Sequence, residues 1–164
     1  NAGGHGSDMS SNIESVDLIE VSTGTAKTLL SNELLFGYRR SAITQDHLVT
    51  QAVLKLNEGD SEESLGAIKD IVRWRLENQP GGQNAGSVFT NPKESSAGRL
   101  IDDAGCKGLR VGTAEVSNKH ANFIQVDPGG KAQDVIDLME LIQERVMSKH
   151  GIILEAETQM IGFS

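Results

Sequence analysis

The sequence contains a single cysteine, Cys106, and no long run of apolar residues. One cysteine excludes an intrachain disulfide and a metal cluster held by thiolates. A membrane-spanning helix needs about 20 consecutive apolar residues, and no segment here approaches that length. We therefore expect no bound metal and no membrane contact, and we expect Cys106 to be a buried or half-buried thiol in a reducing compartment.

Basic residues are also scarce relative to acidic ones. The chain has 15 lysines and arginines against 23 aspartates and glutamates, a formal net charge of −8. A protein that binds nucleic acid needs a basic surface to displace counterions from phosphates. Nucleic acid is therefore excluded as a partner, and any phosphate-binding site must come from a local cluster of basic residues.

Internal repeats, low-complexity tracts and a regular alternation of strands with helices are all missing. Period-two and helical apolar patterns occur instead in mixed order, which favours an α+β fold with mainly antiparallel sheet. The patterns predict strands over 13–21, 26–30, 47–56, 109–116, 122–126 and 152–160, and helices over 61–77, 96–104 and 132–150.

The Pro80-Gly81-Gly82 break predicts a division into two domains, 1–79 and 80–164. The chain opens on an asparagine within a glycine-rich loop rather than on methionine. We therefore expect it to be part of a longer protein.

Four polar segments are candidates for function, the first being N-A-G-G-H-G at residues 1–6. Glycine lets backbone N–H groups approach an anion or a flat ring closely. An ordinary surface loop is the alternative interpretation of this segment.

The second segment, F-G-Y-R-R-S, occupies residues 36–41. An arginine flanked by an aromatic residue and a glycine can be held as a planar fork for a carboxylate or phosphate. A solvated pair of arginines is the alternative.

The third segment, N-A-G-S-V-F-T-N-P, occupies residues 84–92. Its small residues expose the Ser87 hydroxyl, and the basic helix end before it, with Arg73 and Arg75, indicates an anionic ligand. No G-x-S-x-G nucleophile elbow is present, so a serine hydrolase is not indicated. A linker between domains is the alternative.

The fourth segment, L-E-A-E-T-Q-M-I-G, occupies residues 154–162. In a strand, Glu155 and Glu157 would point to the same face, where two carboxylates could perform acid–base chemistry. A solvated edge strand is the alternative.

Taken together and in this order, the four segments resemble motifs of the UDP-N-acetylenolpyruvoylglucosamine reductase family. Two further blocks also match, A-G-R-L-I-D at 97–102 and V-S-N-K-H-A-N-F-I at 116–124. The resemblance extends over residues 1–162 and implies an α+β fold, with the C-terminal part of an FAD-binding domain followed by a small substrate-binding domain.

The resemblance implies an enzyme of peptidoglycan precursor synthesis in the cytoplasm. NADPH would reduce FAD, and the flavin would pass a hydride to UDP-N-acetylglucosamine enolpyruvate, giving UDP-N-acetylmuramate. By motif, Ser87 would donate a proton, and Arg39 and Glu157 would stabilise the charged intermediate.

Binding roles follow from the same resemblance. The diphosphate of the substrate would be bound by Arg75 and Asn91. The residues expected to bind the cofactor are Asn1, Gly3, Gly4, Gly6 and Tyr38, while His120 and Asn122 would support the site without taking part in the chemistry.

The chain also departs from the family pattern. Ala156 stands where the closing motif prefers proline, and Thr158 and Gln159 replace a β-branched apolar residue and an arginine. The short spacers resemble the compact subclass, which lacks a tyrosine-bearing substrate loop.

The family's N-terminal FAD-binding subdomain is missing from this sequence and is the expected partner. One alternative is a non-catalytic fragment that at most binds the UDP-sugar. Another is an acidic α+β interaction module whose motifs match by chance.

Overall fold

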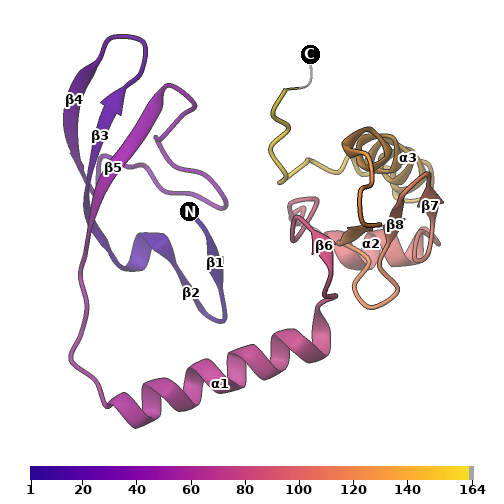
Figure 1. Cartoon of the computed structure of the whole chain (residues 1–164), viewed down its shortest axis with the longest axis horizontal. Helices are drawn as coiled ribbons and strands as arrows, with labels where there is room; N and C mark the ends of the chain where they lie inside the picture. The colour runs from indigo at the N-terminus through magenta and orange to yellow at the C-terminus, as the bar shows by residue number, and fades with distance from the viewer. Residues whose placement is uncertain (163–164) are drawn as a thin grey trace. The chain divides into compact units, whose positions relative to one another are not determined.

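The computed structural model describes residues 1–162 and divides the chain into two compact units, Asn1–Ile68 and the unit that begins at Lys69. Strands pair only in antiparallel fashion among the described residues, and helices and strands mix along the chain (Figure 1). The fold is α+β, as the sequence predicts.

The first unit contains a three-stranded sheet in the order β4-β3-β5. The predicted strands 13–21 and 26–30 form a hairpin, since β3 and β4 pair from Ser15 opposite Leu30 to Glu20 opposite Thr25. Alternation along β3 places Val16 and Leu18 on the buried face. Its elements are β1 (Gly3–Gly4), β2 (Ser7–Asp8), a 3-10 turn (Met9–Ser11), β3 (Ile13–Glu20), β4 (Thr25–Leu30) and β5 (His47–Leu54).

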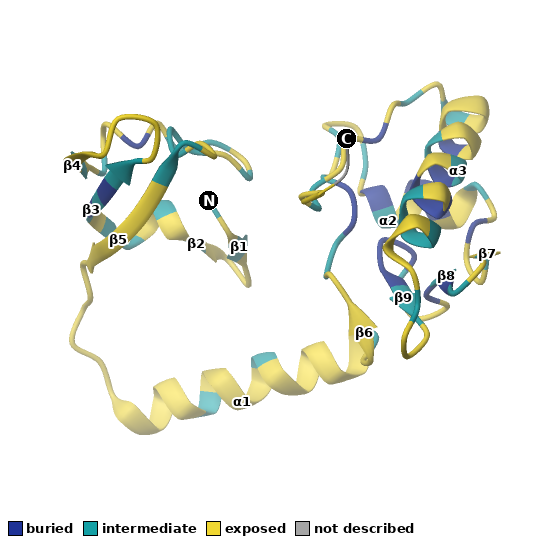
Figure 2. Cartoon of the chain, turned by 45° about the horizontal axis from the view of Figure 1, so that its top comes forward, coloured by how far each residue is buried: buried dark blue, intermediate teal, exposed yellow. Residues whose placement is uncertain are grey.

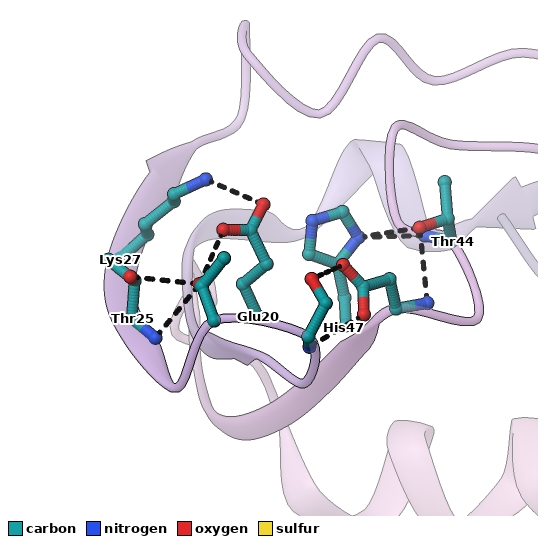
Figure 3. Close-up of polar contacts among 8 residues, drawn as sticks. Glu20, Thr25, Lys27, Thr44 and His47 are labelled. Atoms are coloured by element: carbon teal, nitrogen blue, oxygen red, sulfur yellow. Dashed lines mark hydrogen bonds and ion pairs between the residues drawn. The ribbon is translucent and has the colours of Figure 1, made fainter.

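Hydrogen bonds between polar side chains hold the turn between β3 and β4 (Figure 3). Glu20 accepts from the Thr23 hydroxyl at 2.7 Å and from Lys27 Nζ at 3.1 Å. The Thr23 hydrogen bond, followed by Lys27, lowers the pKa of Glu20. Asp46 closes the other side of the turn by accepting from the Ser22 hydroxyl at 2.6 Å. These exposed contacts fix the hairpin, and no group of described residues here or elsewhere could hold a metal ion.

Helix α1 (Ser61–Asn78) begins where the sequence predicts. The Asp60 side chain accepts from the backbone N–H groups of Glu62 at 2.8 Å and Glu63 at 2.9 Å, as an N-cap does. None of its residues is buried (Figure 2). Its apolar side chains therefore form an exposed stripe, in which Leu65 is 56% and Ile68 57% exposed.

The second unit contains a four-stranded sheet in the order β6-β9-β8-β7 and two helices that pack on each other. Its core includes the fully buried Phe89, Ile101, Leu138 and Ile142. The predicted last helix is confirmed at its ends, and Gly151 follows it with φ 68°. The elements are β6 (Gln83–Asn84), α2 (Ala97–Asp103), β7 (Arg110–Val111), β8 (Ala114–Val116), β9 (Ile124–Val126) and α3 (Ala132–His150).

Two predicted strands are wrong. Residues 109–116 form the hairpin β7–β8, because Gly112 turns the chain at φ 52°. Residues 152–160 form no strand and make only an isolated bridge between Ala156 and Phe89. The pairing is short because its partner segment turns at Gly86, with φ 83°, and ends at Pro92, which has no N–H to donate.

Candidate active site

A tight turn presents Ser87. The Asn84 side chain accepts from Gly86 N at 3.0 Å, and Gly86 takes a left-handed φ of 83°. The next two residues, Val88 and Phe89, are buried in the core. The turn therefore leaves Ser87 partly exposed at the end of a firmly anchored segment.

Glu157 is hydrogen-bonded to the residue after Ser87. Its backbone N–H donates to Val88 O at 2.8 Å, and Thr90 N donates to Glu155 O at 2.9 Å on the other side of the bridge. Two of the three predicted catalytic residues, Ser87 and Glu157, thus lie on paired segments of the second unit. The strand on which Glu155 and Glu157 were to share a face is absent, and Glu155 is exposed while Glu157 is half-buried.

Ser87 and Asn91 line a hollow of about 390 Å³ in the second unit, called here the polar hollow. Basic side chains dominate its charge, and Asp102 pairs with Lys107 at 2.6 Å. The remaining side chains offer hydroxyl, amide and imidazole groups. The full lining is Ser87, Asn91, Ser96, Gly98, Arg99, Asp102, Lys107, Lys119, His120, Ala121 and Asn122.

The His120 imidazole on this wall is held in one tautomer. Its Nδ1 accepts from Asn122 N at 3.2 Å, so the proton of the neutral ring belongs on Nε2. The ring also packs edge-on against Phe123, with centroids 4.8 Å apart. Burial lowers the pKa of His120, which keeps the ring neutral at pH 7.

The two predicted diphosphate-binding residues lie in different surroundings. Asn91 lines the polar hollow and accepts from Ala97 N at 2.9 Å, which holds the start of α2. Arg75 is exposed near the end of α1 and is not one of the described residues that line the hollow. Its neighbour Leu76 is nevertheless tied to the hollow, because Lys119 Nζ donates to Leu76 O.

Three of the predicted cofactor residues line a second hollow, which lies in the first unit. This glycine hollow has a volume of about 380 Å³ and is lined by Gly3, Gly4, Gly6, Ser7, Asp8, Ser11 and Arg39.

Arg39 is held against this loop. Its Nη2 donates to Gly3 O at 3.0 Å, its guanidinium lies 5.1 Å from the centroid of the half-exposed Tyr38 ring, and its backbone has φ 54°. A positive φ is uncommon for a residue with a side chain, so the surrounding contacts determine this conformation.

Asn1 supports the glycine hollow from outside. Its Nδ2 donates to Asp8 Oδ2 at 3.2 Å and to Gly37 O at 3.1 Å, which ties the loop to the segment that carries Arg39. Hydrogen bonds from Ser10 and Ser11 lower the pKa of Asp8 to about 2, so its carboxylate stays ionised.

Comparison with known proteins assigns the family. The sequence model described as "UDP-N-acetylenolpyruvoylglucosamine reductase, C-terminal domain" matches residues 77–161. The chain belongs to this reductase family. A relative named UDP-N-acetylenolpyruvoylglucosamine reductase from Bacillus licheniformis is 39% identical over 165 residues, covering 99% of this chain and 89% of its own length.

Longer reductases match over the whole of this chain but only part of themselves. The one from Synechococcus sp. (strain CC9605) is 38% identical and matches 100% of this chain over 56% of its own length. The crystal structure of the Thermus caldophilus reductase superposes with a TM-score of 0.83 at 38% identity, covering 97% of this chain and 56% of that chain. The chain thus spans about half the length of these two reductases.

Within this reductase fold, sequence reasoning gave no role to the basic residues of the polar hollow. Arg99 and Lys119 lie in the two additional blocks that match the family, and Lys107 lies between them. Three basic side chains and one acidic side chain, Asp102, therefore line one hollow of a chain whose net charge is −8. That signal is invisible in the sequence, because α2 and the loops around it bring the three residues together.

Proposed function

We propose that this chain forms the substrate-binding part and the C-terminal part of the FAD-binding domain of an enzyme that reduces UDP-N-acetylglucosamine enolpyruvate to UDP-N-acetylmuramate in peptidoglycan precursor synthesis. The reaction would use FAD and NADPH. Family membership supports the oxidoreductase assignment, and the polar hollow carries the proposal for the substrate. We retain 1–79 and 80–164 as the proposed FAD-binding and substrate-binding parts.

The polar hollow suits a nucleotide sugar. A diphosphate needs fixed positive charge and directed hydrogen-bond donors, which Arg99, Lys107 and Lys119 provide. The Nε2–H of neutral His120 adds a donor for a carbonyl or hydroxyl oxygen. Asn91 is the proposed diphosphate contact within this lining, and Arg75 is proposed as a second contact near the end of α1.

The proposed chemistry assigns one role to each of three residues. Ser87 would give a proton to the carbon beside the one that receives hydride, and the Asn84–Gly86 turn holds the backbone that carries it. Arg39 would stabilise the negative charge that develops on the substrate carboxylate. Glu157, half-buried beside Val88, would assist as a hydrogen-bond donor when protonated.

The glycine hollow fits a flavin cofactor. A Cβ added at Gly4 or at Gly6 would meet no atom within 4 Å, so the backbone there is open to close approach by a ring or a phosphate. Gly3, Gly4, Gly6 and Tyr38 would hold the cofactor, and Asn1 would keep the loop in shape. When bound, FAD would supply the hydride that it takes from NADPH.

The apolar stripe of α1 supports a partner that covers it. Monomeric proteins rarely expose a contiguous apolar face, and the longer reductases contain additional chain. We propose that the family's N-terminal FAD-binding subdomain packs on this stripe.

A non-catalytic fragment that binds only the UDP-sugar is the second candidate. One observation favours it: the polar hollow lies wholly within the second unit and therefore does not need the cofactor part.

The first test is calorimetric binding of UDP-N-acetylglucosamine to the purified chain. Lys107→Ala and Lys119→Ala should each weaken binding about tenfold, the loss of one charge-assisted hydrogen bond. Lys69→Ala, an exposed lysine outside the hollow, is the matched control. Absence of binding to the wild-type chain, or equal effects of all three variants, would reject the substrate site.

The second test is NADPH oxidation with FAD and UDP-N-acetylglucosamine enolpyruvate. The chain is assayed alone and with the N-terminal region of the Synechococcus reductase. Turnover that appears only in the mixture supports the reductase, and turnover that Ser87→Ala leaves unchanged would refute the role of Ser87. Nucleotide-sugar binding without turnover in the mixture would favour the second candidate.

A further inference from the structure

The segment that follows Ser87 is held by one asparagine. Val88 N donates to the backbone carbonyl of Asn122 at 2.9 Å. Phe89 N donates to Asn122 Oδ1 at 3.0 Å, and Asn122 Nδ2 donates to Phe89 O at 2.8 Å. The carboxamide thus pairs with both backbone groups of Phe89, as a neighbouring strand would.

Every polar group of Asn122 is used. Its backbone N–H donates to His120 Nδ1, its carbonyl accepts from Val88, and its side chain serves Phe89 twice. The residue is only 3% exposed, so losing any one of these bonds would leave a buried polar group unpaired. Leucine has neither donor nor acceptor, and ionised aspartate has no donor for Phe89 O.

The hydrogen bonds that join Asn122 to Val88 and Phe89, called here the clamp, lie between the two proposed catalytic residues of this unit. On one side Asn122 holds Val88 and Phe89, and on the other Val88 O accepts from Glu157 N at 2.8 Å. Ser87 precedes Val88 directly, with only the Gly86 turn before it. Any movement of Val88 is therefore transmitted to both Ser87 and Glu157.

We propose that Asn122 is the positioning residue of this site: its carboxamide and carbonyl set the places of Ser87 and, through Val88, of Glu157. Asn122 also lines the polar hollow, but its polar groups are committed to protein partners, so it acts through residues 88 and 89. The roles of Ser87 and Glu157 rest on the proposed function, whereas the clamp itself does not.

Asn122→Asp offers a test with a distinctive pH signature. At pH 7 the ionised carboxylate repels Phe89 O. The amide groups of residues 86–91 should then move, and their hydrogens should exchange with solvent faster than in the wild type. Near pH 5 the buried carboxyl, whose pKa is raised by desolvation, becomes protonated and can donate to Phe89 O again. The exchange rates, each compared with wild type at the same pH, should then return toward the wild-type values.

Hydrogen exchange followed by NMR measures this on the chain without any ligand. Asn122→Leu should accelerate exchange of the Phe89 amide about 10- to 100-fold at both pH values, the loss of a buried hydrogen bond. The wild-type chain at both pH values controls for titration of the neighbouring His120, Glu155 and Glu157. Amides of α3 should be unaffected by either variant.

Three results would overturn the proposed role of Asn122. The first is that amide exchange at residues 86–91 is unchanged in folded Asn122→Asp, and the second is that exchange in α3 accelerates as much as at Phe89. The third is that the exchange rates of Asn122→Asp do not return toward the wild-type values at the lower pH. A wild-type chain that binds no UDP-sugar would instead reject the proposed substrate and leave these exchange results intact.

In the assembled reductase the same variant should show a kinetic split. Displacement of a proton donor lowers kcat, and a shift near 1 Å is enough for roughly 100-fold. Asn122→Asp should therefore lose kcat with a smaller change in KM, and it should recover part of the loss as the pH falls. A loss confined to KM would show that Asn122 contacts the ligand, and it would overturn a positioning role.

Discussion

The hydroxyl of Thr158 is buried beside an apolar hollow of about 300 Å³, and no described residue accepts or donates a hydrogen bond to it. Because a buried unpaired hydroxyl is destabilising, Thr158→Val should raise the free energy of unfolding by about 1 kcal/mol. Thr90→Val is the control. The Thr90 hydroxyl donates to Glu155 O at 3.3 Å, so its removal should lower the free energy of unfolding. Urea denaturation measures both, and a loss of stability in Thr158→Val would contradict the prediction.

Asp8 makes the stability of the first unit depend on pH in the acidic range. Hydrogen bonds from Ser10 and then Ser11 hold its folded pKa at about 2, below the value of about 3.9 for an unfolded chain. The contribution of the ionised Asp8 to the free energy of unfolding is therefore complete above about pH 4 and is lost as the pH falls toward 2. Thermal unfolding between pH 5 and 2 should show a shallower decline in Asp8→Asn than in the wild type. Parallel curves would show that Asp8 has no such role.

Single residues were predicted from the sequence only where a motif marked them. Ser87, Asn91 and the glycines of residues 1–6 stand in recognisable patterns, and the structure places them on the walls of two hollows. Arg99, Lys107 and Lys119 come from three separate segments, so their clustering depends on the fold. The two hydrogen bonds of the Asn122 side chain span 33 residues and leave no local pattern.

At the scale of elements, the hairpin β7–β8 depends on Gly112. This residue has φ 52°, and a Cβ added to it would lie 2.4 Å from Asp134 Oδ2. That carboxylate accepts from Thr113 N at 2.7 Å, so it cannot move without losing the bond. Gly112→Ala should lower stability by about 2 kcal/mol or more.

Gly105→Ala provides the comparison for the hairpin. Gly105 has a similar φ of 69°, but an added Cβ would meet no atom within 4 Å. Gly105→Ala should therefore lower stability only by the backbone strain, roughly 1 kcal/mol. Equal losses of stability in the two variants, measured by denaturation, would show that the contact with Asp134 has no effect.

The elements with local signals were predicted well. Asp60 and the glycine that follows α3 mark helix ends by chemistry that needs no tertiary contact. The strand expected at 152–160 is absent because its extent is set by the partner segment between Gly86 and Pro92. Such a limit lies outside the segment itself, and periodicity cannot reveal it.

For the whole molecule, burial is uneven between the units. Nearly the entire core belongs to the second unit, whereas the first buries Val16, Leu18 and Leu34. The longer reductases of the family have additional chain available to cover the rest. No helix in the described part of the chain is long and apolar enough to cross a membrane. None of the residues of α1 is buried.

Replacing the stripe should weaken assembly with the N-terminal region of the Synechococcus reductase. Leu65→Ser with Val72→Ser removes apolar area worth about 3 kcal/mol, so the dissociation constant measured by ultracentrifugation should rise roughly 100-fold. Asp70→Ser, an exposed change on the same helix, is the control and should have little effect. Equal association of all variants would place the partner elsewhere.

The edge strands of the two sheets differ in length, and the difference affects the tendency of the chain to aggregate. The edge strands of the second unit, β6 and β7, are two residues long and offer little for another chain to pair with. In the first unit, β5 is an eight-residue edge strand, and after His47 it has no charged residue and no proline. Fibrillar aggregates of the isolated chain are expected to grow from residues 48–54, and a lysine placed there would act as a gatekeeper.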